Sequence, residues 1–325
     1  MFKAAALFIV NKIVVYKVVI NKVATSKVAI SKAVRNKLAF SQAILSLLLL
    51  FAISPLAATS DRGDLYQELQ PGQRAQLTVL YVPAEGFAYT NLQGELTGVS
   101  VEIIRDFANW LQQQHNLRLQ LNFVAETDWQ RFYQRIVQAQ GGVFGLGNVT
   151  ITEPRKQELA FSPPYLHNIA ALISHQDIPA LPAWPAFSEH FAALQPLAFS
   201  GTLHEQRINR LRDQYQPNAL VYQVSSNPEL LTKVASGQYY AYVDAYNYWR
   251  AREAGMPLRD HPIAAETGET FGFIMPHNND WASLLEAFFS ADGGYLNSAR
   301  YRQLLTEQLG PELAQLLLTS KEGEK

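Results

Sequence analysis

The sequence lacks cysteine altogether among its 325 residues, and its first sixty residues lack any acidic side chain. The absence of cysteine excludes disulfides, thiolate zinc sites, iron–sulfur clusters and thiol nucleophiles. It also speaks against the lipidated cysteine that anchors bacterial lipoproteins. The composition that remains, with 48% hydrophobic residues, is sufficient for one large domain or two medium ones.

Charge is distributed unevenly along the chain. Residues 1–60 hold eight basic groups, so residues 61–325 carry 19 basic against 28 acidic groups, a net charge of −9 with histidine neutral. A basic surface supplies most of the affinity of a protein for nucleic acid. We therefore expect no nucleic-acid partner for this acidic part of the chain.

The basic N-terminal region combines two patterns. Lysine recurs at every fifth position from Lys12 to Lys37, a period that fits neither a helix nor a strand. A drifted repeat in the coding DNA or a start codon placed too early explains it, and a basic membrane-surface segment is the alternative. The apolar run 44–53, followed by Pro55 and small residues, is typical of a secretory signal peptide. We expect cleavage near 59–61 and export to a Gram-negative periplasm, with an uncleaved anchor as the alternative.

Strand-like and helix-like segments alternate through the rest of the chain. Four prolines in the segment 177–196 indicate a surface connection without regular structure. A short helix is predicted to begin near 153–154, where proline is tolerated in the first turn. The hydrophobic periodicity predicts strands at 77–82, 117–124, 143–151, 169–174, 197–199, 220–223, 239–243 and 271–275, and helices at 99–111, 128–138, 203–214, 228–235, 281–289 and 297–309.

Two such α/β alternations, joined near 168–176, indicate two lobes with a ligand cleft between them. We predict an α/β fold in which residues 61–168 and 270–325 form lobe 1 and residues 169–269 form lobe 2, after removal of residues 1–60. Open α/β sheets bind ligands at the carboxyl ends of their strands. The cleft between two such sheets is therefore the expected binding site.

The chain contains none of the common catalytic motifs. It has no P-loop, no dinucleotide-binding glycine pattern, no Gly-x-Ser-x-Gly elbow and no His-Glu-x-x-His pair. The seven histidines are far apart, and no pair of carboxylates stands in an apolar setting that would raise a pKa. We predict no catalytic residue, no metal site and no cofactor.

The stretch GNVTITEPRKQELAFSPPY places a cation beside a strand end and a helix start. Arg155 has the planar fork that holds a carboxylate with two hydrogen bonds. Thr150 and Thr152 place hydroxyl and N–H groups where a helix N-terminus favours anions. These residues predict a carboxylate site. The alternatives are an ion pair from Arg155 to Glu153 or Glu158, and ordinary helix capping by the threonines.

This stretch resembles the bacterial family 3 extracellular solute-binding proteins, the periplasmic receptors of polar amino-acid importers. The shared features are a Ser/Thr-rich strand end, Thr-x-x-Arg and a Phe-Ser-x-Pro-Tyr run. The resemblance extends over about 75–310 and implies the type II periplasmic-binding-protein fold. Further matches in family order are Gly-x-Leu-x-Gly at 94–98, Gly-Thr at 201–202, a leucine segment ending at an acid at 231–244, and Asp-Gly-x-Tyr at 292–295.

The resemblance also implies further ligand-binding residues. An acid in the second lobe of family members receives the ligand's ammonium group, and Asp244 matches it with a spacing one residue shorter than usual. Helix capping is the other role open to Asp244. Phe87 and Trp129 correspond to positions that cover the ligand's side chain, with core packing as the alternative. Gly201 and Thr202 would supply backbone contacts at a helix start.

Several positions depart from the family pattern. The usual Asp early in the first helix is Ser100, the usual acid before the Thr-x-x-Arg strand is Phe144, and the usual aromatic in the first loop is Ala84, for which Tyr89 could substitute. The pocket therefore differs from that of a standard polar amino-acid receptor, and the sequence leaves the ligand's identity open.

We therefore predict a monomeric periplasmic binding protein, not an enzyme, that captures a small carboxylate-bearing solute. The solute is expected to be an amino acid or a relative, delivered to the inner-membrane permease of an ABC importer. One alternative is a sensory subunit for a signalling receptor. The other is a dehydratase-like periplasmic enzyme with Glu153 or His167 as its acid or base.

Overall fold

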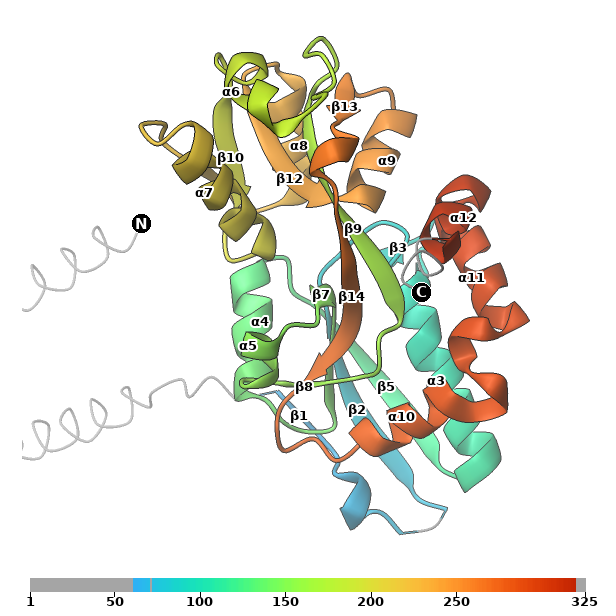
Figure 1. The fold of residues 1–325 in the computed structure, drawn as a ribbon. Helices are drawn as coiled ribbons and strands as arrows, with labels where there is room; N and C mark the ends of the chain where they lie inside the picture. Colours follow the sequence, from blue (N-terminus) through green and yellow to red (C-terminus); the bar gives the residue numbers. More distant parts are fainter. Residues whose placement is uncertain (1–60, 71, 320–325) are drawn as a thin grey trace, which may run out of the picture. The chain divides into compact units, whose positions relative to one another are not determined.

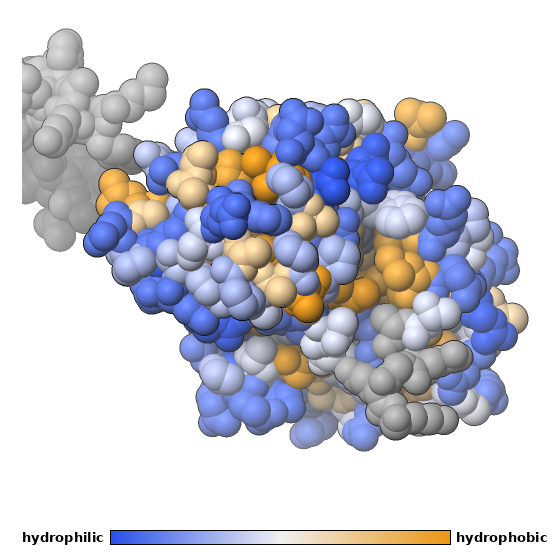
Figure 2. Space-filling view, turned by 45° about the horizontal axis from the view of Figure 1, so that its top comes forward, coloured by the Kyte–Doolittle hydropathy of each residue, from blue (hydrophilic) through white to orange (hydrophobic). Residues whose placement is uncertain are grey.

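The computed structural model describes residues 61–70 and 72–319 (Figure 1). The lysine repeat, the predicted signal peptide and most of the predicted cleavage region lie outside the described residues. Within the described part, no helix combines the length and the hydrophobicity needed to cross a membrane. Figure 2 shows one face, where hydrophilic side chains predominate and hydrophobic ones gather in smaller patches.

A single mixed sheet runs through both lobes. Its path places parallel strands at each end and antiparallel strands in the middle. In spatial order the path consists of β5 (Arg118–Ala125), β2 (Arg74–Tyr81), β7 (Val143–Thr150), β14 (Glu266–Met275), β9 (Leu166–His175), β12 (Tyr239–Asp244), β10 (Gln195–Phe199) and β11 (Tyr222–Val224), with β8 (Ala160–Phe161) beside β14 and β13 (Leu258–Asp260) beside β9.

The strands β9 and β14 connect the lobes as an antiparallel pair of ten-residue strands (Figure 1). Both are longer than the predicted strands 169–174 and 271–275, because their polar ends pair with each other in the crossover and carry no hydrophobic pattern. The register of the pair shifts between Glu266 and Glu269, where Gly268 has a φ of 84°. Only glycine adopts this conformation without steric cost, so a bulge is built into the crossover.

Helices cover the sheet on both sides. In lobe 1, α3, α10 and α11 lie on one side of the sheet and α4 on the other (Figure 1). In chain order the α-helices are α3 (Val99–His115), α4 (Trp129–Gln138), α5 (Glu153–Lys156), α6 (Phe187–His190), α7 (Leu203–Tyr215), α8 (Asn227–Ala235), α9 (Ala245–Glu253), α10 (Ala282–Ser290), α11 (Ala299–Leu309) and α12 (Pro311–Thr319).

The hydrophobic pattern explains where the core lies. Ile103, Phe107 and Leu111 recur every four residues and are fully buried on one face of α3, as the sequence predicts. Val79 and Leu80 are consecutive on β2 and belong to different core clusters, because successive strand side chains point to opposite faces. Lobe 1 therefore has a core on each face of its part of the sheet.

The segment 177–196 corrects one prediction. It contains a 3₁₀ turn (Trp184–Ala186) and the short helix α6, although its prolines predicted no regular structure. The reason is aromatic packing: Phe187 and Phe191 are buried with their ring centroids 4.4 Å apart, and both contact the ring of Tyr240. Burial of these rings outweighs the weak local propensity of the segment.

A buried serine–histidine pair in lobe 2 is structural. The Leu181 N–H donates to Nδ1 of His261 over 3.0 Å, so Nε2 carries the hydrogen and lies 2.8 Å from Oγ of Ser174. Both side chains are inaccessible, with exposed fractions of 1% and 0%. His261 therefore serves neither as a general base nor as a ligand residue.

This histidine predicts a loss of stability in mild acid. Burial lowers the pKa of His261 from 6.5 to about 4. Between these values the unfolded chain binds a proton that the folded protein excludes, so the free energy of unfolding falls as the pH drops from 6.5 to 4, by about 3 kcal/mol for this group. Urea unfolding at a series of pH values should show this fall.

The variant His261→Gln isolates the effect. Glutamine keeps an acceptor for the Leu181 N–H and a donor for Ser174, and it does not titrate. We expect its unfolding free energy to change less over this range than that of the wild type, whereas the exposed His277→Gln should behave as wild type. Parallel pH curves for all three proteins would contradict the assignment.

Candidate functional site

The carboxyl ends of parallel strands from both lobes meet at a cavity of about 540 Å³. Lobe 1 contributes the last residue of β7, Thr150, and the loop after β2. Lobe 2 contributes the last residue of β12, Asp244, and the first residues of α7. A cavity at strand carboxyl ends is the expected place for a ligand, and its volume lies within the range of about 300–1,000 Å³ typical of small-molecule sites.

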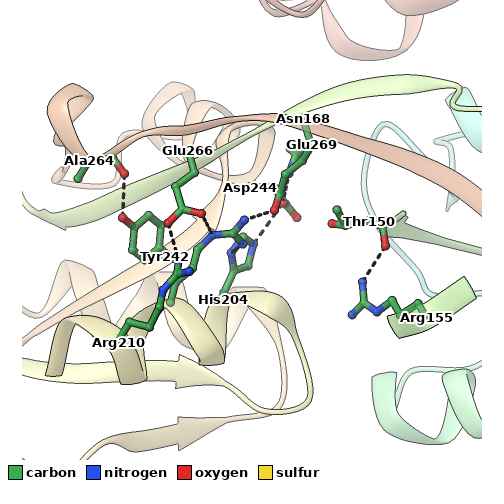
Figure 3. Close-up of polar contacts among 11 residues, drawn as sticks. Thr150, Arg155, Asn168, His204, Arg210, Tyr242, Asp244, Ala264, Glu266 and Glu269 are labelled. Atoms are coloured by element: carbon green, nitrogen blue, oxygen red, sulfur yellow. Dashed lines mark hydrogen bonds and ion pairs between the residues drawn. The ribbon is translucent and has the colours of Figure 1, made fainter. Parts of the chain in front are cut away.

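Arg155 reaches this cavity from α5. Its Nη1 donates to the Thr150 carbonyl over 3.0 Å (Figure 3). Its guanidinium lies 5.9 Å from the centre of the Tyr133 ring. Burial lowers the pKa of Arg155 below its ordinary value, but an arginine remains protonated in a protein. The cavity therefore contains a partly desolvated positive charge.

The carboxylates near Arg155 in the sequence have other partners. Glu153 pairs with Lys156 at 2.7 Å, and Glu158 accepts a hydrogen bond from the Tyr133 hydroxyl at 2.8 Å. Arg155 forms no ion pair with any described residue, so the alternative of a structural ion pair finds no support here. Arg250, the other arginine lining the cavity, is paired with Glu85 at 2.7 Å.

The two threonines differ in position. Thr150 is buried and lines the cavity. Thr152 is not among the residues lining the cavity, and its hydroxyl accepts the Arg155 N–H over 3.4 Å at the start of α5. The capping alternative therefore describes Thr152, because its side chain is turned toward the backbone of its own helix.

Asp244 lies across the cavity from Arg155 and Thr150 (Figure 3). Although it occupies the N-cap position of α9, its side chain caps no N–H group. Its Oδ1 accepts hydrogen bonds from Asn168 at 2.6 Å and from His204 at 3.2 Å. No described residue donates to Oδ2, so half of this carboxylate has its acceptor capacity unused.

Both predicted aromatic residues line the cavity and also pack against neighbours. Phe87 is buried, with its ring centroid 4.4 Å from that of Tyr246 in lobe 2. Trp129 lies at the start of α4, and its indole N–H donates to the Gly201 carbonyl over 3.2 Å. Each ring therefore belongs to an inter-lobe contact as well as to the cavity wall.

Of the Gly-Thr pair at the start of α7, only Thr202 lines the cavity. Thr202 lines the cavity, and its hydroxyl donates to the Phe199 carbonyl over 2.8 Å. Gly201 does not line it, since its carbonyl faces Trp129 and its φ of 77° forms the turn before the helix. The N–H of Gly201 donates to Glu205 over 2.8 Å, so it is already engaged.

Asn148 and His204 are among the cavity residues that the sequence analysis did not identify. Asn148 has a φ of 52° at the register shift between β7 and β14, donates to the Tyr246 hydroxyl (3.0 Å) and accepts from Tyr165 (2.6 Å). The available signal was an asparagine after glycine in a strand, since asparagine tolerates left-handed backbone. His204 lies two residues after the helix-opening Thr202, and no sequence pattern marks it.

A metal-binding role has no structural support in the described residues, which contain no group of three or more histidine, aspartate or glutamate side chains positioned to hold an ion.

Comparison with known proteins identifies the family. The sequence profile of the bacterial extracellular solute-binding proteins, family 3, matches residues 77–291. The chain belongs to this family.

Solved structures share the fold of this family 3 protein at low sequence identity. An ancestral arginine-binding protein bound to arginine is 15% identical, with a TM-score of 0.56, covering 72% of this chain and 98% of that chain. The arginine-, lysine-, histidine-binding protein ArtJ from Geobacillus stearothermophilus is 17% identical, with a TM-score of 0.55 and coverages of 74% and 99%. No curated protein gives a match.

A third neighbour is the ancestral amino acid-binding protein AncCDT-1, described as a precursor of cyclohexadienyl dehydratase. It is 19% identical, with a TM-score of 0.51, and the alignment covers 72% of this chain and 95% of that chain. These likenesses concern the fold. The family match and the neighbours together confirm the predicted two-lobed type II fold of this solute-binding protein.

Proposed function

We propose that this solute-binding protein captures an α-amino acid or a close relative in its cavity, in the periplasm, and delivers it to the permease of an ABC importer. The observation that carries the proposal is the half-buried guanidinium of Arg155, which has no ion-pair partner among the described residues and faces a carboxylate of Asp244 with one oxygen free of donors. Burial lowers the pKa of Arg155, and Asp244 is close enough for its charge to offset part of that effect. An amino acid zwitterion complements this pair of charges.

Each end of a zwitterion meets a suitable group. The α-carboxylate would bind Arg155 with the backbone at Thr150, and the ammonium group would bind Oδ2 of Asp244. The side chain would then lie between Phe87 and Trp129. The arginine-, lysine- and histidine-binding neighbours support this class of ligand, and membership of the solute-binding family supports the permease as partner.

Closure of the lobes would couple binding to delivery. We propose lobes formed by residues 61–168 with 270–325 and by residues 169–269, moving as a monomer about β9 and β14. Contacts of Phe87 and Asn148 with Tyr246 join the lobes beside the cavity. A ligand bridging Arg155 and Asp244 would add a further link and favour the closed form.

The enzymatic alternative has weaker support. Glu153 and His167, the acid–base candidates, are absent from the cavity wall, and Glu153 is exposed and paired with Lys156. The neighbour described as a dehydratase precursor is itself an amino acid-binding protein. We therefore propose binding without chemical conversion.

The test is a thermal-shift screen of the protein expressed from the full chain and purified from the periplasm. The screen would cover the common L-amino acids, simple carboxylates and muropeptides, with mass spectrometry of the recovered ligand. An L-α-amino acid should raise the melting temperature, because ligand at 100 times Kd adds about 2.7 kcal/mol to the unfolding free energy. Absence of any amino-acid response, or a ligand consumed during incubation, would contradict the proposal.

A further inference from the structure

A closed ring of hydrogen bonds holds the carboxylate of Asp244 (Figure 3). The Asn168 amide donates to Asp244 at 2.6 Å and to Glu269 at 3.1 Å. Arg207 forms a hydrogen bond to Glu269, and its Nη1 donates a hydrogen bond to Nδ1 of His204 at 3.1 Å. Nε2 of His204 lies 3.2 Å from Oδ1 of Asp244. The ring joins α7 and β12 of lobe 2 to both crossover strands.

The ring determines the tautomer of His204. A guanidinium group has only donors, so the nitrogen facing Arg207 must accept a hydrogen bond. The imidazole therefore carries its hydrogen on Nε2 and donates it to Asp244. His204 is only 7% exposed although it lines the cavity, so packing restricts its ring to this orientation.

The donors in the ring leave one oxygen of Asp244 for a ligand. Asn168 and His204 both donate to Oδ1, and no described residue donates to Oδ2. This arrangement fixes the rotation of the carboxylate about its χ2 bond, because both donors must stay in reach of the same oxygen. The remaining acceptor is therefore presented in a defined direction before a ligand arrives.

The charges of the ring and its neighbours leave one negative charge unbalanced. Apart from Arg155 across the cavity, the group holds three carboxylates, Asp244, Glu266 and Glu269, and two guanidinium groups, Arg207 and Arg210, with Glu266 bonding to Arg207 at 2.7 Å and to Arg210 at 2.8 Å. With His204 neutral, the group carries a net charge of −1. An ammonium group at Oδ2 would bring it to zero.

We propose that His204 is a positioning residue for ammonium recognition, acting through Asp244 and selecting amine-bearing ligands over their desamino counterparts. This inference rests on the proposed function, since it needs an amino acid as ligand. His204 contributes a neutral donor and no charge, so it orients the carboxylate without neutralising it. A lysine or arginine at this position would instead occupy the charge that the ligand's ammonium group needs.

The test compares His204→Asn with His204→Gln. The asparagine side chain reaches Arg207 but is too short to reach Asp244, whereas the glutamine amide nitrogen reaches about as far as Nε2 of histidine. Isothermal titration would use L-arginine, L-lysine, L-histidine and L-glutamine, each beside its desamino counterpart. His204→Asn should weaken amino-acid binding about tenfold or more relative to the wild type. The same variant should bind the desamino compounds within about twofold of the wild type. His204→Gln should restore amino-acid binding to within about threefold of the wild type.

The controls separate this inference from the proposed function. His277→Asn removes an exposed histidine that also makes one hydrogen bond, to the Gln157 carbonyl at 2.9 Å, and it should bind as wild type. Equal losses for amino acids and desamino compounds, or no recovery in His204→Gln, would overturn the role of His204 while the binding function stands. Wild-type protein that binds none of the amino acids would overturn both.

Discussion

Replacement of Arg155 by methionine is expected to abolish amino-acid binding while leaving the ligand-free protein at least as stable as the wild type. The ligand would lose two charge-assisted hydrogen bonds, each contributing about 1.5–3 kcal/mol, so Kd should rise at least about a hundredfold. The effect on stability has the opposite direction. A half-buried charge without an ion-pair partner opposes folding, and an apolar side chain of similar length removes this cost.

A loss of affinity together with unchanged or higher stability of the ligand-free protein would identify Arg155 as a cation that binds the ligand. A structural ion pair would give the reverse pattern on stability, because breaking it leaves an unpaired carboxylate. The matched control is Lys156→Met on the same helix, which removes an exposed pair with Glu153 and should change neither quantity much. Calorimetric titration and thermal unfolding of the three proteins measure both. A lower ligand-free melting temperature together with unchanged affinity in Arg155→Met would contradict the site.

Replacement of Asp244 by asparagine is expected to weaken amino-acid binding by about thirtyfold or more, the equivalent of about 2 kcal/mol. Asparagine keeps an oxygen for Asn168 and His204 but removes the negative charge that the ammonium group requires. Ligands without an amino group should lose little affinity. The selectivity ratio between an amino acid and its desamino counterpart therefore falls in this variant.

The matched control for the second prediction is Asp260→Asn. Asp260 follows β12 in lobe 2 and accepts a side-chain hydrogen bond from the Tyr248 hydroxyl at 2.7 Å, but it does not line the cavity. Its replacement should leave the Kd within about twofold of wild type. If both variants lost affinity equally, the effect of Asp244→Asn would reflect a general disturbance of lobe 2.

The fold was predictable where local pattern and burial agree. The four-residue repeat of Ile103, Phe107 and Leu111 identified α3, because one apolar face of that helix packs on the sheet. Four of the predicted ligand-binding residues line the cavity at strand ends, Thr150 and Arg155 predicted from their chemistry and Thr202 and Asp244 from the family resemblance. Thr150, Arg155, Thr202 and Asp244 lie at or just after the carboxyl ends of β7, β10 and β12, where ligand sites occur in α/β sheets.

The rest of the site could not be predicted, because it depends on contacts between distant positions. Asn168 lies 76 residues from Asp244 and 101 from Glu269, and it binds both. No local sequence motif links residues so far apart, so the ring around Asp244 can be recognised only in the folded protein. Thr152 and Gly201 show the converse case: their local chemistry fits a ligand site, but the Thr152 hydroxyl faces the backbone of its own helix and the Gly201 carbonyl faces Trp129.

The continuity of the sheet has a mechanical consequence. Because β9 and β14 remain hydrogen-bonded as they pass between the lobes, a relative rotation of the lobes must be absorbed as elastic twisting of a two-stranded ribbon, with no slack linker to take it up. Such a ribbon resists sliding and stores energy when twisted, so it restores its resting shape when the load is removed. The bulge at Gly268 interrupts the regular pairing of this ribbon, and it lies one residue from Glu269 in the ring that holds Asp244.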